Sequence, residues 1–260
     1  MLSAENITIQ FGGLVAVKDV TFTIPPHSVV SLIGPNGAGK TTFFNILTGL
    51  YRPTSGRVLL NGRDVTGKSP HKIAGWGLAR TFQNIRLFNL MTAEENVMVA
   101  MHPHLRSGIA STVLRLPGQR REERESREQA RELLEFVGIG PTADEYARNL
   151  SYGDQRRLEV ARALALRPKV LLLDEPTAGM NPQESATFVE FVYRVRDEKD
   201  LSVLLIEHDM SVVMKVSERI TVLDRGAQIA EGSPDDIRTN ERVVEAYLGK
   251  TGTREGRRLA

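Results

Sequence analysis

The chain has no cysteine, so it can form neither a disulfide framework nor a cysteine-ligated metal site, and its chemistry cannot rest on a thiol. This composition suits a reducing cytoplasm. No apolar run approaches the ~18 residues that a membrane-spanning helix needs. The first residues also lack the basic and then apolar pattern of a secretory signal. We therefore expect any connection with a membrane to run through a partner.

The chain has little excess charge, because 34 Lys and Arg stand against 32 Asp and Glu. A formal net charge of +2 does not argue for nucleic acid, and we expect no nucleic-acid partner. At 260 residues, the chain is long enough for a large α/β domain with a substantial core. Residues 249–260 form a locally basic tail, which we expect to be a disordered terminus.

What the sequence does contain is a phosphate-binding loop. Residues 34–41 read GPNGAGKT and fit the pattern GxxxxGK[ST], between an apolar run and an expected helix. Glycines allow a tight turn whose N–H groups face phosphate oxygens, and the start of the helix adds the positive end of its dipole. We expect Lys40 to reach the β- and γ-phosphates and the Thr41 hydroxyl to coordinate Mg²⁺. The residues expected to bind the nucleotide are Gly34, Pro35, Asn36, Gly37, Ala38, Gly39, Lys40, Thr41 and Thr42.

Hydrophobic patterning predicts an α/β core that is interrupted by helices. A helical texture covers about 92–165, where the apolar residues Ala130, Leu133, Leu134 and Val137 fall on one stripe. Strands alternating with helices elsewhere favour a mainly parallel sheet with right-handed crossovers. We expect one domain, residues 1–248, with the core at 1–90 and 166–248 and the helical lobe at 91–165. A loop with at most a short helix is expected at 102–119. The expected strands are 4–10, 18–24, 29–33, 57–60, 170–173, 203–207, 220–223 and 228–230.

Two carboxylates, Asp174 and Glu175, follow a strand at 170–173 that is too apolar to be half exposed. Adjacent residues at the end of a strand point in different directions, so one carboxylate can hold Mg²⁺ while the next faces the attacking water. We assign Asp174 to the metal and Glu175 to the general base, which positions and polarises water because the transition state is loose. Alternatively, the pair only caps the end of a strand.

A histidine, His208, follows the next expected strand. Parallel strands bring their carboxyl ends to one edge of a sheet, where ligands bind, so His208 could contact the γ-phosphate and register hydrolysis. A lone histidine in this position could equally be an ordinary surface residue.

Residues 150–158, LSYGDQRRL, open a helix about twenty residues before Asp174. Ser151 is a good N-terminal cap, and Gly153 keeps the backbone accessible, which suits an anion. The segment resembles the signature motif of ATP-binding cassette (ABC) proteins, usually written LSGGQ, with a tyrosine and an aspartate in place of the first glycine and the glutamine. The resemblance implies two cassettes that sandwich two ATP molecules head to tail. It assigns contact with the ATP of the other subunit to Leu150, Ser151, Tyr152, Gly153 and Asp154.

Further segments fit the same family over residues 2–248. Phe11 resembles the aromatic residue that stacks on adenine, although a ring there could also belong to the core. Gln83 matches the glutamine loop, which implies an approach to Mg²⁺ and the attacking water. Asn181 stands where the family's D-loop usually has aspartate, so it keeps a hydrogen-bonding side chain without the charge. The D-loop comprises Ala178, Gly179, Met180 and Asn181.

The family resemblance implies a P-loop NTPase cassette, with a RecA-like, mainly parallel core, an N-terminal antiparallel β subdomain and an inserted helical lobe. Within the family, FGGL at 11–14, RTFQNIRLF at 80–88 and GMNP at 179–182 resemble the LivG-type ATPase subunits of branched-chain amino acid importers. Such a subunit uses ATP and Mg²⁺ and lies peripherally on the cytoplasmic face of the inner membrane. Its implied partners are membrane permease subunits, a second cassette that is a copy or a paralogue, and indirectly an external solute-binding protein.

Other functions stay open at this point. Related cassettes serve urea and lipopolysaccharide transport, and soluble cassette proteins act in DNA repair or translation. The chain carries neither a long coiled-coil insertion nor a second cassette, which those soluble classes usually have, and it lacks the NKxD motif of GTP-binding switches. The permease interface is expected between Gln83 and the helical lobe, near residues 88–97, whose apolar side chains could instead be lobe core.

Overall fold

The computed structural model describes residues 1–104 and 117–247. It divides into two compact units: Ala79–Pro168, here named the helical unit, and the described residues on either side of it, here named the core unit. The basic tail expected at 249–260 lies outside the described residues. Within the described ranges, no helix has both the length and the apolar character to cross a membrane.

A four-stranded antiparallel sheet forms one layer of the core unit, in the order β2-β1-β4-β5. Its strands are β1 (Leu2–Phe11), β2 (Leu14–Ile24), β4 (Ser55–Leu60) and β5 (Arg63–Asp64). Alternate residues of β1 are buried, so one face of the sheet points into the core. Asn61 and Gly62 join β4 to β5 with φ values of 51° and 77°, the left-handed conformation that a tight hairpin turn requires.

A six-stranded sheet forms the next layer, in the order β10-β9-β3-β8-β7-β6. The central strand β3 (Val29–Ile33) is parallel to both of its neighbours, so that Val30 pairs with Leu204 on one side and Arg219 on the other. Strands β3, β7 and β8 are buried along their whole length, which explains why their sequences are mostly apolar. The remaining strands are β6 (Leu78–Arg80), β7 (Val170–Asp174), β8 (Ser202–Ile206), β9 (Arg219–Asp224) and β10 (Ala227–Gly232).

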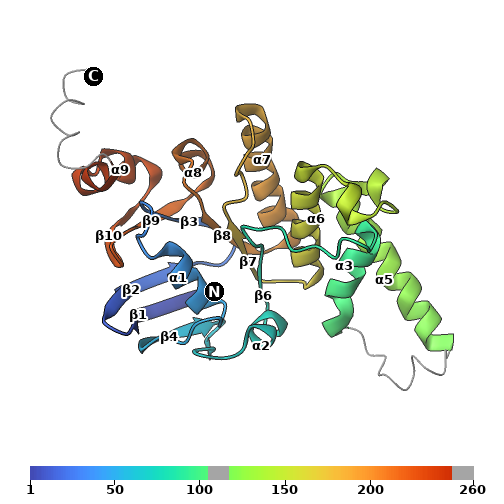
Figure 1. Ribbon diagram of the computed structural model, residues 1–260, viewed down its shortest axis with the longest axis horizontal. Coiled ribbons are helices and arrows are strands. Elements are labelled where there is room, and N and C mark those ends of the chain that lie inside the picture. The colour runs from blue at the N-terminus through green and yellow to red at the C-terminus, as the bar shows by residue number, and fades with distance from the viewer. Residues whose placement is uncertain (105–116, 248–260) are drawn as a thin grey trace. The chain divides into compact units, whose positions relative to one another are not determined.

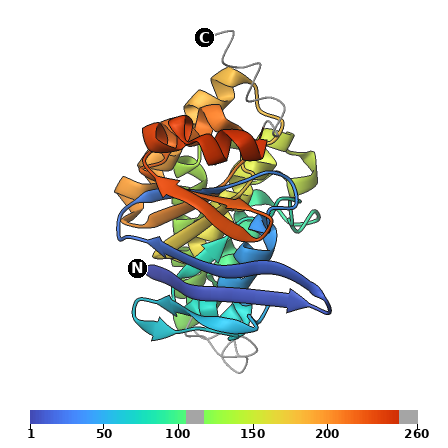
Figure 2. The same cartoon turned by 90° about the vertical axis from the view of Figure 1, so that its left-hand side faces the viewer.

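Helices cover both faces of the six-stranded sheet. In both views of the ribbon, α1 (Lys40–Leu47) lies between the two sheets, where its buried Phe43 and Phe44 join one hydrophobic core with residues of both (Figures 1 and 2). A second core on the opposite face includes Val213 of α8 and Ile237 of α9. The helices on that face are α7 (Pro182–Lys199), α8 (Met210–Val216) and α9 (Pro234–Thr239) (Figure 1), and α2 (Pro70–Gly75) precedes β6.

The helical unit contains α3 (Ala93–Met101), α5 (Pro117–Phe136) and α6 (Tyr152–Ala165). The predicted apolar stripe is confirmed, since Ala130 and Leu134 of α5 and Val137 just after it are buried and Leu133 is half-buried. The loop expected at 102–119 is wrong at its end, because α5 already begins at Pro117, and residues 105–116 of that loop lie outside the described ranges. Proline suits the first turn of a helix, where its missing N–H would have no intrahelical partner.

The expected fold class is confirmed in its main features. The core unit combines an antiparallel sheet from the N-terminal part of the chain with a mainly parallel sheet, and helices interrupt it in the sequence. Each predicted strand is present: the strand at 29–33 has the predicted ends, and the others differ at one end or both. One shift matters for the site, because β8 ends at Ile206 and thereby places Glu207 in the loop that follows.

Candidate functional site

The phosphate loop joins β3 to α1, as its sequence predicts. Gly34 lies so close to β9 that an added Cβ would meet the carbonyl oxygen of Leu223 at 2.1 Å. Gly39 precedes α1 with a φ of 97° and contributes no side-chain cap to the helix. The first turn of α1 therefore presents its backbone N–H groups without a capping side chain, which is the arrangement that binds phosphate at a helix N-terminus.

The Lys40 ammonium folds back over this loop. Its Nζ donates to the carbonyl oxygens of Gly34 at 2.6 Å and Pro35 at 3.1 Å. Burial lowers the pKa of Lys40 from its usual 10.5, while the negative charges of Glu175 and Asp174 act in the opposite direction. The amine and the two carboxylates therefore belong to one electrostatic site.

The hydroxyl-bearing residues lie on the first turn of α1. Thr41 is exposed and Thr42 is half-buried, whereas the next two residues are the buried phenylalanines that hold the helix in the core. Asn36 and Gly37 are exposed at the tip of the loop, and Ala38 is buried. The loop thus has an accessible rim for a ligand and an anchored base.

The two predicted carboxylates occupy different environments. Asp174 is the last residue of β7, pairs with Ile206 of β8 and is buried. Glu175 follows with a φ of 47°, donates its N–H to the carbonyl of Ile206 at 2.8 Å and keeps 24% of its side chain exposed. A left-handed conformation costs a glutamate roughly 1–2 kcal/mol, and such strain is found where a side chain must point in a particular direction.

His208 lies beside the proposed base, as the sheet topology predicts. Its Nδ1 is 3.9 Å from Glu175 Oε2 and 3.7 Å from Glu207 Oε2. Its side chain is 62% exposed, so the imidazole can reach a ligand in front of the sheet edge. The structure therefore brings together the phosphate-loop lysine, Asp174, Glu175 and His208 within the core unit.

Sequence reasoning missed one residue of this group, Glu207. Its carboxylate is fully buried and accepts hydrogen bonds from the backbone N–H groups of Thr177 at 2.9 Å, His208 at 3.0 Å and Asp209 at 3.3 Å. The Thr177 hydroxyl donates to it as well. Glu207 therefore fastens the loop after β7 to the loop after β8. The signal available was a charged residue directly after the apolar run at 203–206.

The D-loop residues Ala178, Gly179, Met180 and Asn181 lead from this group into α7. Asn181 caps that helix, because its Oδ1 accepts from the N–H groups of Gln183 and Glu184, both at 3.0 Å. Glu184 in turn accepts from the Asn181 N–H at 2.8 Å. The substitution that the sequence shows at Asn181 thus preserves a complete capping box.

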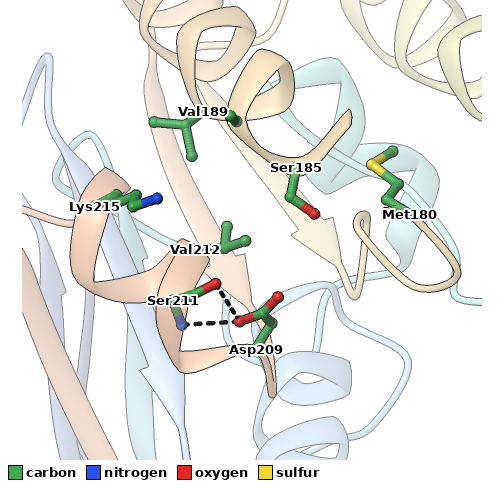
Figure 3. A pocket seen from close by; sticks show the side chains of 8 residues that line it. Met180, Ser185, Val189, Asp209, Ser211, Val212 and Lys215 are labelled. Atoms are coloured by element: carbon green, nitrogen blue, oxygen red, sulfur yellow. Dashed lines mark hydrogen bonds between the residues drawn. The ribbon is translucent and has the colours of Figure 1, made fainter. Parts of the chain in front are cut away.

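A small hollow lies next to the D-loop in the core unit. Figure 3 shows Met180 on one side of it and Asp209 on the other, where Asp209 Oδ1 accepts from the N–H and the hydroxyl of Ser211 at 2.8 and 2.7 Å. These hydrogen bonds, led by the one from the hydroxyl, lower the pKa of Asp209 despite some desolvation. The hollow shows that the D-loop and the loop after His208 are neighbours. Its volume is about 140 Å³.

The signature segment opens α6 in the helical unit. Ser151 caps the helix by accepting from the Asp154 N–H at 3.1 Å, and its hydroxyl donates to Asp154 Oδ2 at 2.8 Å. Tyr152 and Gly153 are exposed and Leu150 is buried beneath them. The cap and the accessible glycine match the sequence-based expectation for this helix N-terminus.

Gln83 and Phe11 are both on the surface. Gln83 is an exposed residue of the helical unit, after β6. Phe11 ends β1 and keeps 46% of its surface exposed, so it is not a core residue. It makes an edge-to-face contact with Tyr51, with ring centroids 5.4 Å apart, and Tyr51 is a second exposed aromatic that the sequence did not single out.

Comparison with known proteins gives a consistent result. The family model described as ABC transporter matches residues 17–178, and the model described as Branched-chain amino acid ATP-binding cassette transporter matches residues 227–252. The transport ATP-binding proteins BraF of Pseudomonas aeruginosa and LivG of Escherichia coli K12 are 48% and 46% identical to the chain, each over 96% of it and 98% of the relative. The solved ADP conformation of MJ1267, an ATP-binding cassette of an ABC transporter, is 31% identical with a TM-score of 0.83 and covers 96% of this chain and 99% of its own.

Proposed function

This chain belongs to the ABC transporter family, and from that premise we propose that it is the ATP-hydrolysing subunit of an importer for branched-chain amino acids. The observation that carries the substrate is the near-complete match with BraF and LivG, both of which are high-affinity branched-chain amino acid transport proteins by name. The match of residues 227–252 to the branched-chain model supports it from a separate part of the chain.

The competing transport systems receive less support. A lipopolysaccharide export ATP-binding protein, LptB of Haemophilus influenzae, is also similar over 96% of the chain but is only 34% identical. The difference between 34% and 48% favours amino acid import. This subunit does not contact the solute in the mechanism below, so the choice rests on relatedness and needs a transport measurement.

ATP is the substrate of such a cassette, and we propose that the phosphate loop binds its β- and γ-phosphates. The backbone N–H groups of residues 36–42 and the Lys40 ammonium supply the positive side of the contact. Glu175 orients and polarises the attacking water, and His208, which lies beside Glu175, donates to the γ-phosphate. Phe11, with Tyr51 against its edge, offers an aromatic surface for adenine.

The residues present also fit Mg²⁺. Among residues 1–104 and 117–247, no group of three or more acidic or histidine side chains could hold a metal. Mg²⁺ bound with a nucleotide, however, uses one or two protein ligands together with phosphates and water. The exposed Thr41 hydroxyl and the Asp174 carboxylate are such ligands, and the role expected for Gln83 stays a prediction. The metal, when bound, would neutralise phosphate charge.

A second cassette, either a copy or a paralogue, is the proposed partner for the signature segment. The capped N-terminus of α6, which comprises 14 residues, offers backbone N–H groups around Gly153 that suit the γ-phosphate bound by the partner. A related cassette of 27% identity has been solved as a dimer, with a TM-score of 0.76. Residues 150–154 and the D-loop would then complete the partner's site.

Permease subunits and an external solute-binding protein complete the proposed importer, with this chain on the cytoplasmic face of the inner membrane. In the segment expected to meet the permease, Ala93 and Val97 are buried as lobe core, whereas a group of large apolar side chains in the rest of the segment and near it is exposed. These residues are Phe88, Leu90, Met91, Val99 and Tyr146.

The experiment that tests the catalytic assignment compares the wild type with Glu175→Gln. We expect ATP turnover to fall by about 100-fold or more, because the amide cannot act as a base, while an ATP-bound dimer accumulates. Glu190→Gln, an exposed glutamate of α7, is the matched control and should keep the wild-type rate. Wild-type turnover in Glu175→Gln would refute the role of Glu175.

The substrate is tested in vesicles that contain the full set of subunits. With ATP, we expect labelled leucine to accumulate when the complex contains the wild-type chain and not to accumulate when it contains Glu175→Gln. ATP-driven uptake of urea without leucine would contradict the proposed substrate and leave the ATPase assignment intact.

A further inference from the structure

Two side chains of α6 bind the main chain that carries Gln83, and a third side chain of α6 holds one of them in place. Residues 81–88 form neither a helix nor a strand, so their backbone N–H and C=O groups need partners outside regular structure. Tyr152, Arg156 and Glu159 lie at positions i, i+4 and i+7 of α6 and therefore share one face of the helix. We name these three residues the α6 clamp.

Arg156 binds two successive carbonyl groups of the loop. Its Nη1 donates to Phe82 O at 2.9 Å and its Nη2 donates to Gln83 O at 2.7 Å. Its side chain is only 8% exposed, and Glu159 Oε2, 3.6 Å from Nη1, balances the buried charge. A planar guanidinium makes these two contacts through two separate nitrogens in one fixed orientation.

Glu159 binds the other main-chain polar group of Phe82. Its Oε1 accepts the N–H of Phe82 at 3.1 Å. Arg156 and Glu159, which lie on successive turns of α6, therefore hold the loop through one backbone donor and two backbone acceptors. A loop anchored in this way follows the helix when the helix moves.

Tyr152 holds the arginine in place. Its Oη accepts from Arg156 Nε at 3.2 Å and from Nη2 at 2.8 Å, and the guanidinium carbon lies 5.3 Å from the centre of its ring. The signature pattern has glycine at this position, and glycine offers neither contact. The tyrosine therefore adds a connection that a signature with glycine does not have.

We propose that the α6 clamp makes the position of Gln83 depend on α6, so that Gln83 and the signature segment at the start of that helix move as one element during turnover. Arg156 and Glu159 are positioning residues, because they touch the main chain of the loop and act through Gln83. The inference rests on the proposed function, since that function gives Gln83 a part in hydrolysis and gives residues 150–154 a contact with the ATP of the partner cassette.

Arg156→Met tests the clamp, because it keeps the aliphatic stem and removes all the donors. We expect hydrogen exchange of the Phe82 and Gln83 amides to rise. We expect kcat for ATP to fall about tenfold, equivalent to 1.4 kcal/mol, with KM changed by less than about twofold because the phosphate loop is untouched. Tyr152→Phe, which removes only the hydroxyl, should fold normally and lose about threefold in kcat.

The control is Arg157→Met, on the next residue of the same helix. Arg157 is exposed and donates to Gly138 O at 3.4 Å, so its variant should show wild-type exchange and kinetics. A double variant supplies the decisive comparison. If Arg156 acts through Gln83, then Gln83→Ala with Arg156→Met is no slower than Gln83→Ala alone, whereas multiplied losses would overturn the inference.

The exchange measurement needs no nucleotide, so it separates the clamp from the proposed function. Unchanged exchange in Arg156→Met would show that the clamp does not hold the loop. Raised exchange with unchanged kcat, measured with the partner subunits if the purified chain alone is inactive, would refute its part in hydrolysis. If the wild-type complex does not hydrolyse ATP at all, that result would instead refute the proposed function.

Discussion

The two units of this chain hold their functional residues by different means. In the core unit, Asp174, Glu175 and His208 lie at or just beyond the ends of buried parallel strands, and the strand ladder itself fixes their positions. In the helical unit, the segment around Gln83 has no ladder of its own, and side chains from neighbouring helices hold its backbone. One region is held mainly through strand pairing, and the other through side-chain contacts with its backbone.

This difference suits the proposed cycle. A phosphate site benefits from donors that do not move, because fixed dipoles need no reorganisation when charge develops. A segment that reports to partner subunits must instead change its position at modest cost. Substitutions in the core unit should therefore damage stability and nucleotide binding together, whereas substitutions in the helical unit should leave the phosphate site intact.

The largest expected effect is at Gly34. Gly34→Ala would place a Cβ 2.1 Å from the backbone oxygen of Leu223, so the phosphate loop or β9 must shift. We expect the free energy of unfolding to fall by about 4 kcal/mol and ATP binding to be lost, as measured by denaturant titration and calorimetry. Gly37→Ala is the control, because its added Cβ meets no atom within 4 Å. It should cost only the ~1 kcal/mol of a left-handed conformation.

Glu207→Gln should have the second largest effect. The amide keeps the size of the side chain but loses an acceptor where four donors converge, at a fully buried position. We expect a loss of about 3 kcal/mol in stability and a lower kcat, measured by unfolding and ATPase assays. Glu198→Gln removes an exposed ion pair with Arg194 and should cost less than about 0.5 kcal/mol. Equal effects of the two variants would contradict the role given to Glu207.

Asn96→Ala tests the corresponding prediction for the helical unit. Buried Asn96 accepts from the Phe88 N–H at 2.9 Å and donates to the carbonyls of Phe88 at 3.0 Å and Thr92 at 2.9 Å. We expect a loss of about 2 kcal/mol with unchanged ATP affinity in a binding titration. The control is Asn89→Ala, at an exposed position, which should change neither stability nor ATP affinity. Loss of ATP affinity in Asn96→Ala would break the distinction between the units.

The smallest expected effect is on pH dependence. Burial raises the pKa of Glu159 above its usual 4.5, although the Phe82 N–H and the charges of Arg156 and Arg162 act against it. The folded chain then binds more protons than the unfolded chain between pH 4.5 and the raised pKa, so the contribution of Glu159 to stability falls as pH rises through that window. The difference in unfolding free energy between the wild type and Glu159→Gln should therefore vary with pH, and a constant difference would contradict this.

The same contrast explains what could be predicted from sequence. The loop around Lys40 and the carboxylates after β7 were predictable because strand, turn and helix follow one another locally, and parallel strands bring distant ends to one edge. The roles of Glu207, Asn96 and Arg156 were not predictable, because the sequence does not show whether a polar side chain is buried or which backbone groups it binds. Their partners lie up to 74 residues away and are defined only by packing.

The order of strands in the six-stranded sheet also bears on how the protein is made. Strand β3, which leads into the phosphate loop, has both of its neighbours, β8 and β9, in the last quarter of the chain. A ribosome synthesises β3 and the loop early, but neither can reach its final surroundings until Asp224 at the end of β9 has emerged. The nascent chain therefore carries a nucleotide-binding sequence without a nucleotide-binding site until β9 has been synthesised, and ATP can stabilise the fold only from that point on.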